Sequence, residues 1–400
     1  MRCMLINTYR CILYYIIAEI RKILQPFSQI PSYNYFLIMT RQVVILGGSF
    51  SAIVALKSVL ATKTEELKVV IVSPSEYAWN NTTVPRLLVE TDQKDKTIVS
   101  LKQSIEKNSK NSVHKAKLIK GKAVSVDLEN KTVEVSTGES LDYTQLIIAT
   151  GERSDTPVFR SIYDHVEQFN HIDQLSENIK SSKSIAIIGG GATGVEVAGE
   201  LGYAYGKDKN IVIYTGAKAP LQMLSTSSQT TAQRKLEELN IEVINNLKVT
   251  DITKNSITFE DGTNKSFDLV IPAFKSIPNS EFLPKKILDA SGHVKTDKHF
   301  RVYGYSDVMA VGDISSITVK SLFNIYYIQS RVVRNTIEHM LTGRGSVEKK
   351  QYSPPTQPTI LVPISRNGGV GAVFGWSIPS LLVKLKGRDF GIFKTEQLLS

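Results

Sequence analysis

Cysteine is almost absent from this 400-residue chain: its two copies, Cys3 and Cys11, both lie among the first eleven residues. The rest of the sequence therefore cannot form a disulfide, a thiolate zinc site or a redox Cys-x-x-Cys pair. Chemistry that relays electrons between two facing sulfurs is excluded as well. The six histidines are scattered singly, and no metal site is predicted.

An apolar segment long enough to span a bilayer is missing near the N-terminus. The continuous apolar run there, residues 11–18, has eight members, whereas a spanning helix needs about 20. We keep three interpretations of residues 1–39: a mitochondrial presequence, an interfacial anchor, or sequence upstream of a true start at Met39. The expected localisation is the cytoplasm or the mitochondrion, with peripheral attachment to a membrane as an alternative.

Acidic side chains are scarce at both ends of the chain. The net charge is +10, and residues 341–400 carry eight basic and three acidic side chains. Basic ends suit an anionic membrane surface, although ordinary solubilising lysines are an equal interpretation. The lysine-rich stretch 102–122 has no interleaved aromatic residue to stack on bases. No specific nucleic-acid partner is therefore predicted.

The most informative stretch, residues 184–200, reads as a strand, a tight turn and a helix. An apolar run leads into Gly189-x-Gly191-x-x-Gly194. In such a loop the first glycine permits the turn, the second lets a pyrophosphate approach the backbone, and the third lets helix and strand pack closely. The pyrophosphate then sits at the positive end of the helix. This stretch predicts a dinucleotide site.

A degenerate copy of this loop lies upstream, where a strand ends in Gly47 and Gly48 and the turn closes at Ala52. Ser49 stands where the second glycine is usual, so it adds bulk where a pyrophosphate must approach. Two such loops about 140 residues apart predict two nucleotides, one of them a flavin. After the second βαβ unit no acidic residue follows the strand, and Lys218 is near, so we expect NADPH to be tolerated.

Strands and helices alternate from Gln42 onward, which predicts an α/β fold with parallel sheets. The expected helices cover residues 53–62, after the first glycine loop, and 322–341, besides the one that follows the second glycine loop. The expected strands are residues 42–46, 68–72, 123–127, 131–136, 145–151, 184–188, one that ends at 213–215, 267–272 and 307–313.

Four motifs resemble, in order, those of the pyridine-nucleotide FAD oxidoreductases: residues 47–52, 149–151, 189–200 and 311–313. Within this superfamily the chain is similar to the apoptosis-inducing-factor-2 group, the ferroptosis-suppressor-like NAD(P)H:quinone oxidoreductases. The more specific resemblance rests on the segments 81–86, 365–371 and 381–390. It covers residues 42–395.

The resemblance implies two Rossmann-like dinucleotide-binding domains, the FAD domain being interrupted by the NAD(P)H domain, and a small C-terminal α+β piece. We expect an N-terminal extension at 1–39, the two FAD parts at 40–160 and 285–345, the NAD(P)H domain at 161–284, and a C-terminal interface or membrane-contact segment at 346–400.

The resemblance also implies site residues. The FAD pyrophosphate would be held by the first loop, with Arg86 as a nearby cation. Val124 would contact the adenine end by its backbone, and Asp313 would accept from the ribityl chain. The complete set implied for FAD is Gly47, Gly48, Ser51, Ala52, Arg86, Val124, Ala149, Thr150, Gly151 and Asp313; that for NAD(P)H is Gly189, Gly191 and Gly194.

Two further residues are implied near the reacting groups: Lys320 beside flavin and acceptor, and Glu196 on the nicotinamide side. The implied activity is hydride transfer from NAD(P)H to the flavin and electron transfer to a quinone or another small acceptor. The alternative is a redox-sensing, apoptosis-inducing-factor-like signalling protein with little turnover, motivated by Ser49 and by Phe274 and Lys275, which stand where a Thr-Gly pair is expected.

The C-terminal segment alternates apolar and cationic residues between Trp376 and Lys394. Such a pattern is typical of an interfacial helix that contacts a membrane and reaches a dissolved quinone. Core packing or a homodimer face explains the same stripe equally well.

Overall fold

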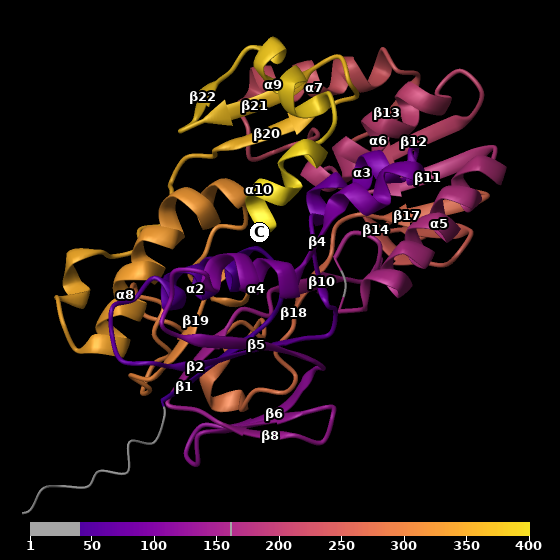
Figure 1. The fold of residues 1–400 in the computed structure, drawn as a ribbon. Helices are drawn as coiled ribbons and strands as arrows, with labels where there is room; N and C mark the ends of the chain where they lie inside the picture. Colours follow the sequence, from indigo (N-terminus) through magenta and orange to yellow (C-terminus); the bar gives the residue numbers. More distant parts are fainter. Residues whose placement is uncertain (1–40, 161) are drawn as a thin grey trace, which may run out of the picture. The chain divides into compact units, whose positions relative to one another are not determined.

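The computed structural model describes residues 41–160 and 162–400 (Figure 1). The three interpretations of residues 1–39 fall outside the described residues. Two parallel sheets with covered faces dominate the part that is described, and the predicted α/β class with two Rossmann-type units is confirmed. Among these residues no helix has both the length and the apolar character that crossing a membrane requires.

The first sheet has five parallel strands in the order β19-β9-β1-β2-β5. Its strands are β1 (Gln42–Leu46), β2 (Lys68–Ser73), β5 (Lys115–Lys120), β9 (Gln145–Ile148) and β19 (Val308–Ala310). Successive side chains of β1 alternate between two cores: Val43 and Ile45 join one, Val44 and Leu46 the other. All four are buried, as expected for a parallel sheet covered on both faces.

Helices cover one face of this sheet and a small antiparallel sheet covers the other (Figure 1). The helices are α2 (Phe50–Leu60), α4 (Leu101–Ser109) and α8 (Ser330–Thr342); the antiparallel strands are β6 (Ala123–Asp127), β7 (Thr132–Val135) and β8 (Ser140–Asp142). The predicted helix at 322–341 is confirmed, but it opens with a π-helical segment, η6 (Asn324–Gln329). Short strands β3 (Tyr77–Trp79) and β4 (Ile98–Ser100) pair nearby, next to α3 (Val84–Leu87).

The second parallel sheet has the order β13-β12-β11-β17. Its strands are β11 (Ser184–Ile188), β12 (Asn210–Tyr214), β13 (Ile241–Ile244) and β17 (Leu269–Pro272). One face packs against α5 (His165–Ser181), α6 (Ala192–Tyr205) and α7 (Thr226–Glu237). The other face packs against β14 (Val249–Ile252), β15 (Ser256–Phe259) and β16 (Asn264–Ser266).

The chain passes between the two sheets twice, and the two passages pair with each other. Strand β10 (Glu152–Ser154) leaves the first sheet and lies antiparallel to β18 (Ser276–Pro278), which returns from the second. Residues 155–275 therefore begin and end at neighbouring points. This two-stranded ribbon also carries Glu152, whose side chain is fully buried.

The C-terminal segment contacts both units. Its antiparallel strands β20 (Ile360–Pro363), β21 (Gly369–Val373) and β22 (Trp376–Ser377) precede the helices α9 (Ser380–Gly387) and α10 (Thr395–Leu399). Val362 and Val370 join the core of the second sheet, whereas Leu399 joins the core of the first.

Candidate active site

One large cavity of about 1610 Å³ opens at the carboxyl ends of β1, β2 and β9. Open α/β sheets place ligands at this edge, and typical small-molecule sites measure about 300–1,000 Å³. The cavity is lined by the first glycine loop, by residues 149–153 and by Asp313 and Lys320. Its far end is lined by η6, α9 and α10. A dinucleotide and a second ligand would fit this space together.

The first glycine loop has a geometry that only small residues allow. Gly47 has φ +126°, and a Cβ there would lie 2.4 Å from the carbonyl oxygen of Ala149. A Cβ on Gly48 would lie 2.3 Å from the Ser73 hydroxyl. Ser49 begins α2 with an extended backbone, φ −121°, which any residue adopts. Serine at this position therefore causes no backbone strain.

The second glycine loop matches the three roles predicted for it. Gly189 has φ +127°, and a Cβ there would lie 2.9 Å from the Ala273 carbonyl. A Cβ on Gly194 would lie 1.9 Å from the Gly189 carbonyl, so this residue sets the close contact of helix and strand. Around Gly191 no atom lies within 4 Å of where a Cβ would be, which leaves room for a pyrophosphate. These glycines do not line the large cavity, although Ala192 and Glu196 of the following helix do.

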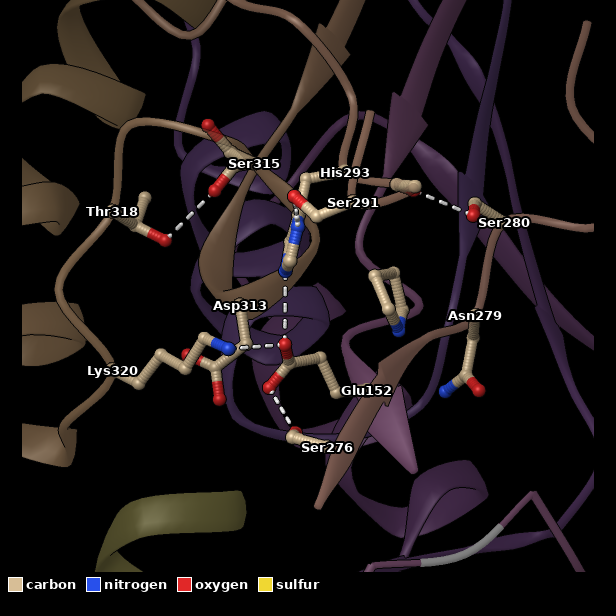
Figure 2. A network of polar contacts seen from close by, with 12 residues as sticks. Glu152, Ser276, Asn279, Ser280, Ser291, His293, Asp313, Ser315, Thr318 and Lys320 are labelled. Atoms are coloured by element: carbon tan, nitrogen blue, oxygen red, sulfur yellow. Dashed lines mark hydrogen bonds and ion pairs between the residues drawn. The ribbon is translucent and has the colours of Figure 1, made fainter. Parts of the chain in front are cut away.

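A buried carboxylate forms the centre of the polar cluster in this cavity (Figure 2). The side chain of Glu152 is fully buried. Its Oε1 accepts hydrogen bonds from Lys320 and, at 2.9 Å, interacts with His293 Nε2. Its Oε2 accepts from Ser276 at 2.5 Å and from Arg160 at 2.9 Å. The sequence motifs did not point to Glu152, Arg160 or His293.

Asp313 lies beside this cluster, and one of its two carboxylate oxygens has no hydrogen-bond partner. Oδ2 accepts from Arg160 at 3.0 Å, whereas Oδ1 is buried and has no hydrogen-bond partner. Burial raises the pKa of Asp313 above its ordinary value, and the Arg160 guanidinium opposes this shift. An unpaired buried acceptor is costly, so a ligand hydroxyl donating to Oδ1 would stabilise the site. This is the role implied for Asp313 toward the ribityl chain.

Replacing Glu152 by glutamine should change how stability depends on pH. Burial alone would raise the pKa of Glu152, but hydrogen bonds from Lys320, Ser276 and His293 outweigh it and hold the pKa below the ordinary 4.5. The stabilisation is thus complete above pH 4.5 and is lost as pH falls through the lower folded value. We expect Glu152→Gln to lower the free energy of unfolding more at about pH 7 than at about pH 3, measured by urea unfolding.

The exposed Glu106 on α4 provides the matched control. Glu106→Gln should change the free energy of unfolding by less than about 0.5 kcal/mol at both pH values, as surface substitutions usually do. An equal destabilisation by Glu152→Gln at the two pH values would contradict the assignment of a charged, hydrogen-bonded Glu152.

Glu196 is held by the C-terminal segment. Its Oε1 accepts from Lys386 of α9 at 2.8 Å, and the same ammonium donates to the Leu361 carbonyl at 2.8 Å. Burial raises the pKa of Glu196, with Lys386 opposing the shift. Both side chains line the cavity. The residue predicted on the nicotinamide side is thus brought to the same cavity as Asp313 and Lys320.

Arg86 has a different place from the one implied for it. Its guanidinium is buried and forms a bidentate ion pair with Glu200 of α6, with N···O distances of 2.6 and 3.1 Å. The remaining donors reach the carbonyls of Gly387 at 2.8 Å and Arg388 at 3.0 Å. Arg86 donates four hydrogen bonds within the protein and does not line the cavity. Its guanidinium therefore joins three segments instead of facing a pyrophosphate.

The other residues implied for FAD lie on the cavity or next to it. Ala149, Thr150, Gly151 and Val124 line it, as does Ser51, whose hydroxyl would lie 2.1 Å from a Cβ on Gly312. Ala52 is buried in the first core. The cradle of positive-φ glycines and the unpaired Asp313 oxygen together fit a flavin dinucleotide, held by the first loop, residues 149–151 and Asp313. Among the described residues no metal-binding group of three side chains occurs.

Comparisons with known proteins match most of this chain to one family. The chain matches the pyridine nucleotide-disulphide oxidoreductase family over residues 41–341. Oxidoreductase ptaL of Pestalotiopsis fici is 30% identical over 359 residues, which cover 86% of this chain and 94% of that protein. Ferroptosis suppressor protein 1 of Homo sapiens is 26% identical, with 87% and 92% covered.

Among solved structures, the sulfide:quinone oxidoreductase of Aquifex aeolicus has a TM-score of 0.69 at 16% identity, covering 90% of this chain and 92% of that chain. This likeness shows the fold. The family match spans both glycine loops and Asp313, and both cysteines lie outside it. On these grounds the chain belongs to the pyridine nucleotide-disulphide oxidoreductase family.

Proposed function

We propose that this chain oxidises NAD(P)H and reduces a quinone-type acceptor, with FAD as its cofactor. Family membership makes it an NAD(P)H-dependent flavin oxidoreductase. The observation that carries the choice of acceptor is the composition of the cavity: its polar part, around Asp313, merges with an apolar part. The apolar part is lined by Phe323, Tyr326, Tyr327, Leu382, Leu385, Phe390 and Phe393.

An apolar, planar acceptor suits this end of the cavity. Bound FAD would take up a hydride from NAD(P)H and pass on electrons. Lys320 lines the cavity with 38% of its side chain exposed, so its ammonium can stabilise negative charge that develops on an acceptor oxygen. The aromatic pair Phe323 and Tyr327 stacks with ring centroids 5.0 Å apart and lines the apolar part. Such faces favour a ring over a flexible polar acceptor.

The test is anaerobic titration of the purified protein, yellow if it holds flavin. We expect NADH or NADPH to bleach the flavin spectrum, and a short-chain ubiquinone analogue to restore it with one quinone reduced per nucleotide oxidised. Rapid bleaching with no reoxidation by any quinone would overturn the choice of acceptor. A yellow protein that NAD(P)H does not bleach would instead favour the redox-sensing alternative.

We also propose that the C-terminal segment contacts a membrane surface. Trp376 is 81% exposed and Leu381 is 72% exposed, and the cations Lys384, Arg388 and Lys394 are close by in sequence. Exposed aromatic and aliphatic side chains among lysines favour an anionic lipid interface. The same segment also lines the apolar part of the cavity through Leu382 and Leu385, so a lipid-dissolved acceptor would enter beside it.

Exchanging the two most exposed side chains should weaken membrane binding. We expect Trp376→Ser combined with Leu381→Ser to lower binding to vesicles of phosphatidylcholine and phosphatidylserine at least about tenfold, because each loses roughly 1.5–3 kcal/mol of apolar burial. Sedimentation with vesicles measures it. Val113→Ser is the control, since Val113 is 63% exposed but lies after α4. Equal vesicle binding by all variants would favour simple solvent exposure of these side chains. A native protein whose molecular mass in solution doubles as its concentration rises would favour a homodimer face.

A further inference from the structure

Glu152 connects the cavity with a polar residue that does not line it. Lys320, which lines the cavity, and His293, which does not, both contact the same oxygen, Oε1. Figure 2 shows Lys320 and His293 reaching this oxygen of Glu152 from two different sides. The carboxylate thus bridges an ammonium and an imidazole from segments more than a hundred residues away from it in sequence.

The connected hydrogen-bonding groups continue from His293 toward solvent. His293 Nδ1 lies 3.1 Å from the Ser291 hydroxyl, and Ser291 is exposed. The side chain of His293 is itself 15% exposed. Lys320, Glu152, His293 and Ser291 therefore form a continuous chain of hydrogen-bonding groups from the cavity to solvent, with the fully buried Glu152 at its middle.

The proposed reaction needs such a connection. NAD(P)H delivers two electrons and one proton as hydride, whereas a quinone becomes a hydroquinone by taking two electrons and two protons. The balanced reaction is NAD(P)H + H⁺ + quinone → NAD(P)⁺ + hydroquinone, so one proton per turnover must come from solvent. Among its aromatic and leucine side chains, the apolar part of the cavity offers no group that is charged at neutral pH.

We propose that Glu152 and His293 carry this solvent proton to Lys320, an inference that rests on the proposed reduction of a quinone-type acceptor. An N–H bond of Lys320 breaks as an O–H bond forms on the acceptor. The Nε2–H bond of His293 then breaks as its proton passes over Glu152 Oε1 to Lys320 Nζ, and Nδ1 takes up one proton from solvent. Rotation of the imidazole returns an N–H to Glu152 and completes the cycle. No oxidant or reductant is needed, because only protons move.

Charged groups surround the proposed path on every side. Glu152 faces Lys320, Arg160 and His293, and it interacts unfavourably with Asp313. His293 also faces Asp289, whose Oδ1 lies 3.9 Å from Nδ1.

The test compares two acceptors in the same protein sample, with NADH as donor. Dichlorophenolindophenol takes up protons with its electrons, whereas ferricyanide takes one electron and no proton. The measured ratio is the rate with dichlorophenolindophenol divided by the rate with ferricyanide. We expect His293→Gln to lower this ratio about 10²-fold, which is the size of a typical general-acid contribution.

Chemical rescue by added imidazole distinguishes a proton-carrying role of His293 from a structural role. In His293→Ala, added imidazole should restore the ratio in proportion to its concentration. His339→Gln, near the end of α8, is the matched control and should leave the ratio unchanged. A ratio in His293→Gln equal to that of the native chain, or no rescue by imidazole, would overturn the proton path. Because both acceptors are artificial, the result does not depend on whether a quinone is reduced.

A readout without turnover completes the test. In a ¹⁵N-labelled sample the imidazole signals of the six histidines are recorded by NMR, and that of His293 is identified by its loss in His293→Gln. We expect the His293 imidazole signals to change position in Glu152→Gln, since the carboxylate that contacts Nε2 is gone. Unchanged His293 signals in this variant would contradict the contact on which the path depends.

Discussion

Valine in place of Gly47 is expected to yield a colourless protein with at least about 10²-fold weaker FAD binding. Two independent causes act together. The backbone at φ +126° disfavours any side chain by about 1–3 kcal/mol, and the new Cβ would lie 2.4 Å from the Ala149 carbonyl. Moving that carbonyl displaces residues 149–151, which line the same cavity. Fluorescence titration of the apoprotein with FAD measures the change.

Gly138→Val supplies a control with the same kind of backbone cost. Gly138 has φ +87° in the turn between β7 and β8, and no atom lies within 4 Å of the position that a Cβ would take there. It does not line the cavity. We expect this variant to lose some stability but to bind FAD as the native chain does. If both variants bound FAD equally well, the first loop would not be the pyrophosphate site.

Breaking the Arg86–Glu200 pair should have the largest effect on stability. Arg86→Met leaves the fully buried Glu200 carboxylate without its bidentate partner. Removing one member of a buried pair typically costs about 3–5 kcal/mol, because the other charge remains desolvated. Burial already raises the pKa of Glu200 and Arg86 opposes that shift, so in the variant the carboxyl should take up a proton more readily. Denaturant unfolding of the apoprotein measures the loss.

The double variant separates the two roles considered for Arg86. Arg86→Met with Glu200→Gln removes both charges, and we expect it to recover most of the lost stability, since replaced pairs are often neutral. A cation serving only the FAD pyrophosphate would instead leave the stability of the apoprotein unchanged and weaken FAD binding alone. That outcome would restore the role implied by the resemblance.

Local patterns were sufficient to predict the central strands of both parallel sheets, but not the strands β5 and β13. The run 184–188 before Gly189 and the run 42–46 before Gly47 are buried strands followed by helices, as the spacing indicates. Such units depend on residues within about 30 positions of each other, so a single sequence contains them. The helix start at Ser49, with negative φ, accepts serine without backbone strain. The expected effect of its bulk on an approaching pyrophosphate stays a prediction.

The polar cluster could not be predicted in the same way. Glu152, His293 and Lys320 meet only because β10 pairs with β18 and because η5 (Gly312–Ile314) follows β19 in the first sheet. No motif spacing encodes such a meeting. A partial signal was present, since Glu152 directly follows the predicted Ala149–Gly151 turn at the ligand edge of a parallel sheet. Arg86 failed for the opposite reason: its motif was visible, but its partners on α6 and at the end of α9 were not.

The pairing of β10 with β18 also bears on how such a chain can arise and be re-engineered. Since residues 155–275 start and finish side by side, they form, for the first sheet, one long hairpin connection. Closing a loop grows costlier only with the logarithm of its length, about 0.6 kcal/mol for each doubling. Closing a whole nucleotide-binding unit at this one place therefore adds little entropic penalty for the first sheet. The unit is held to the rest of the chain by its packing contacts, such as those of Glu200 with Arg86 and of the second sheet with Val362.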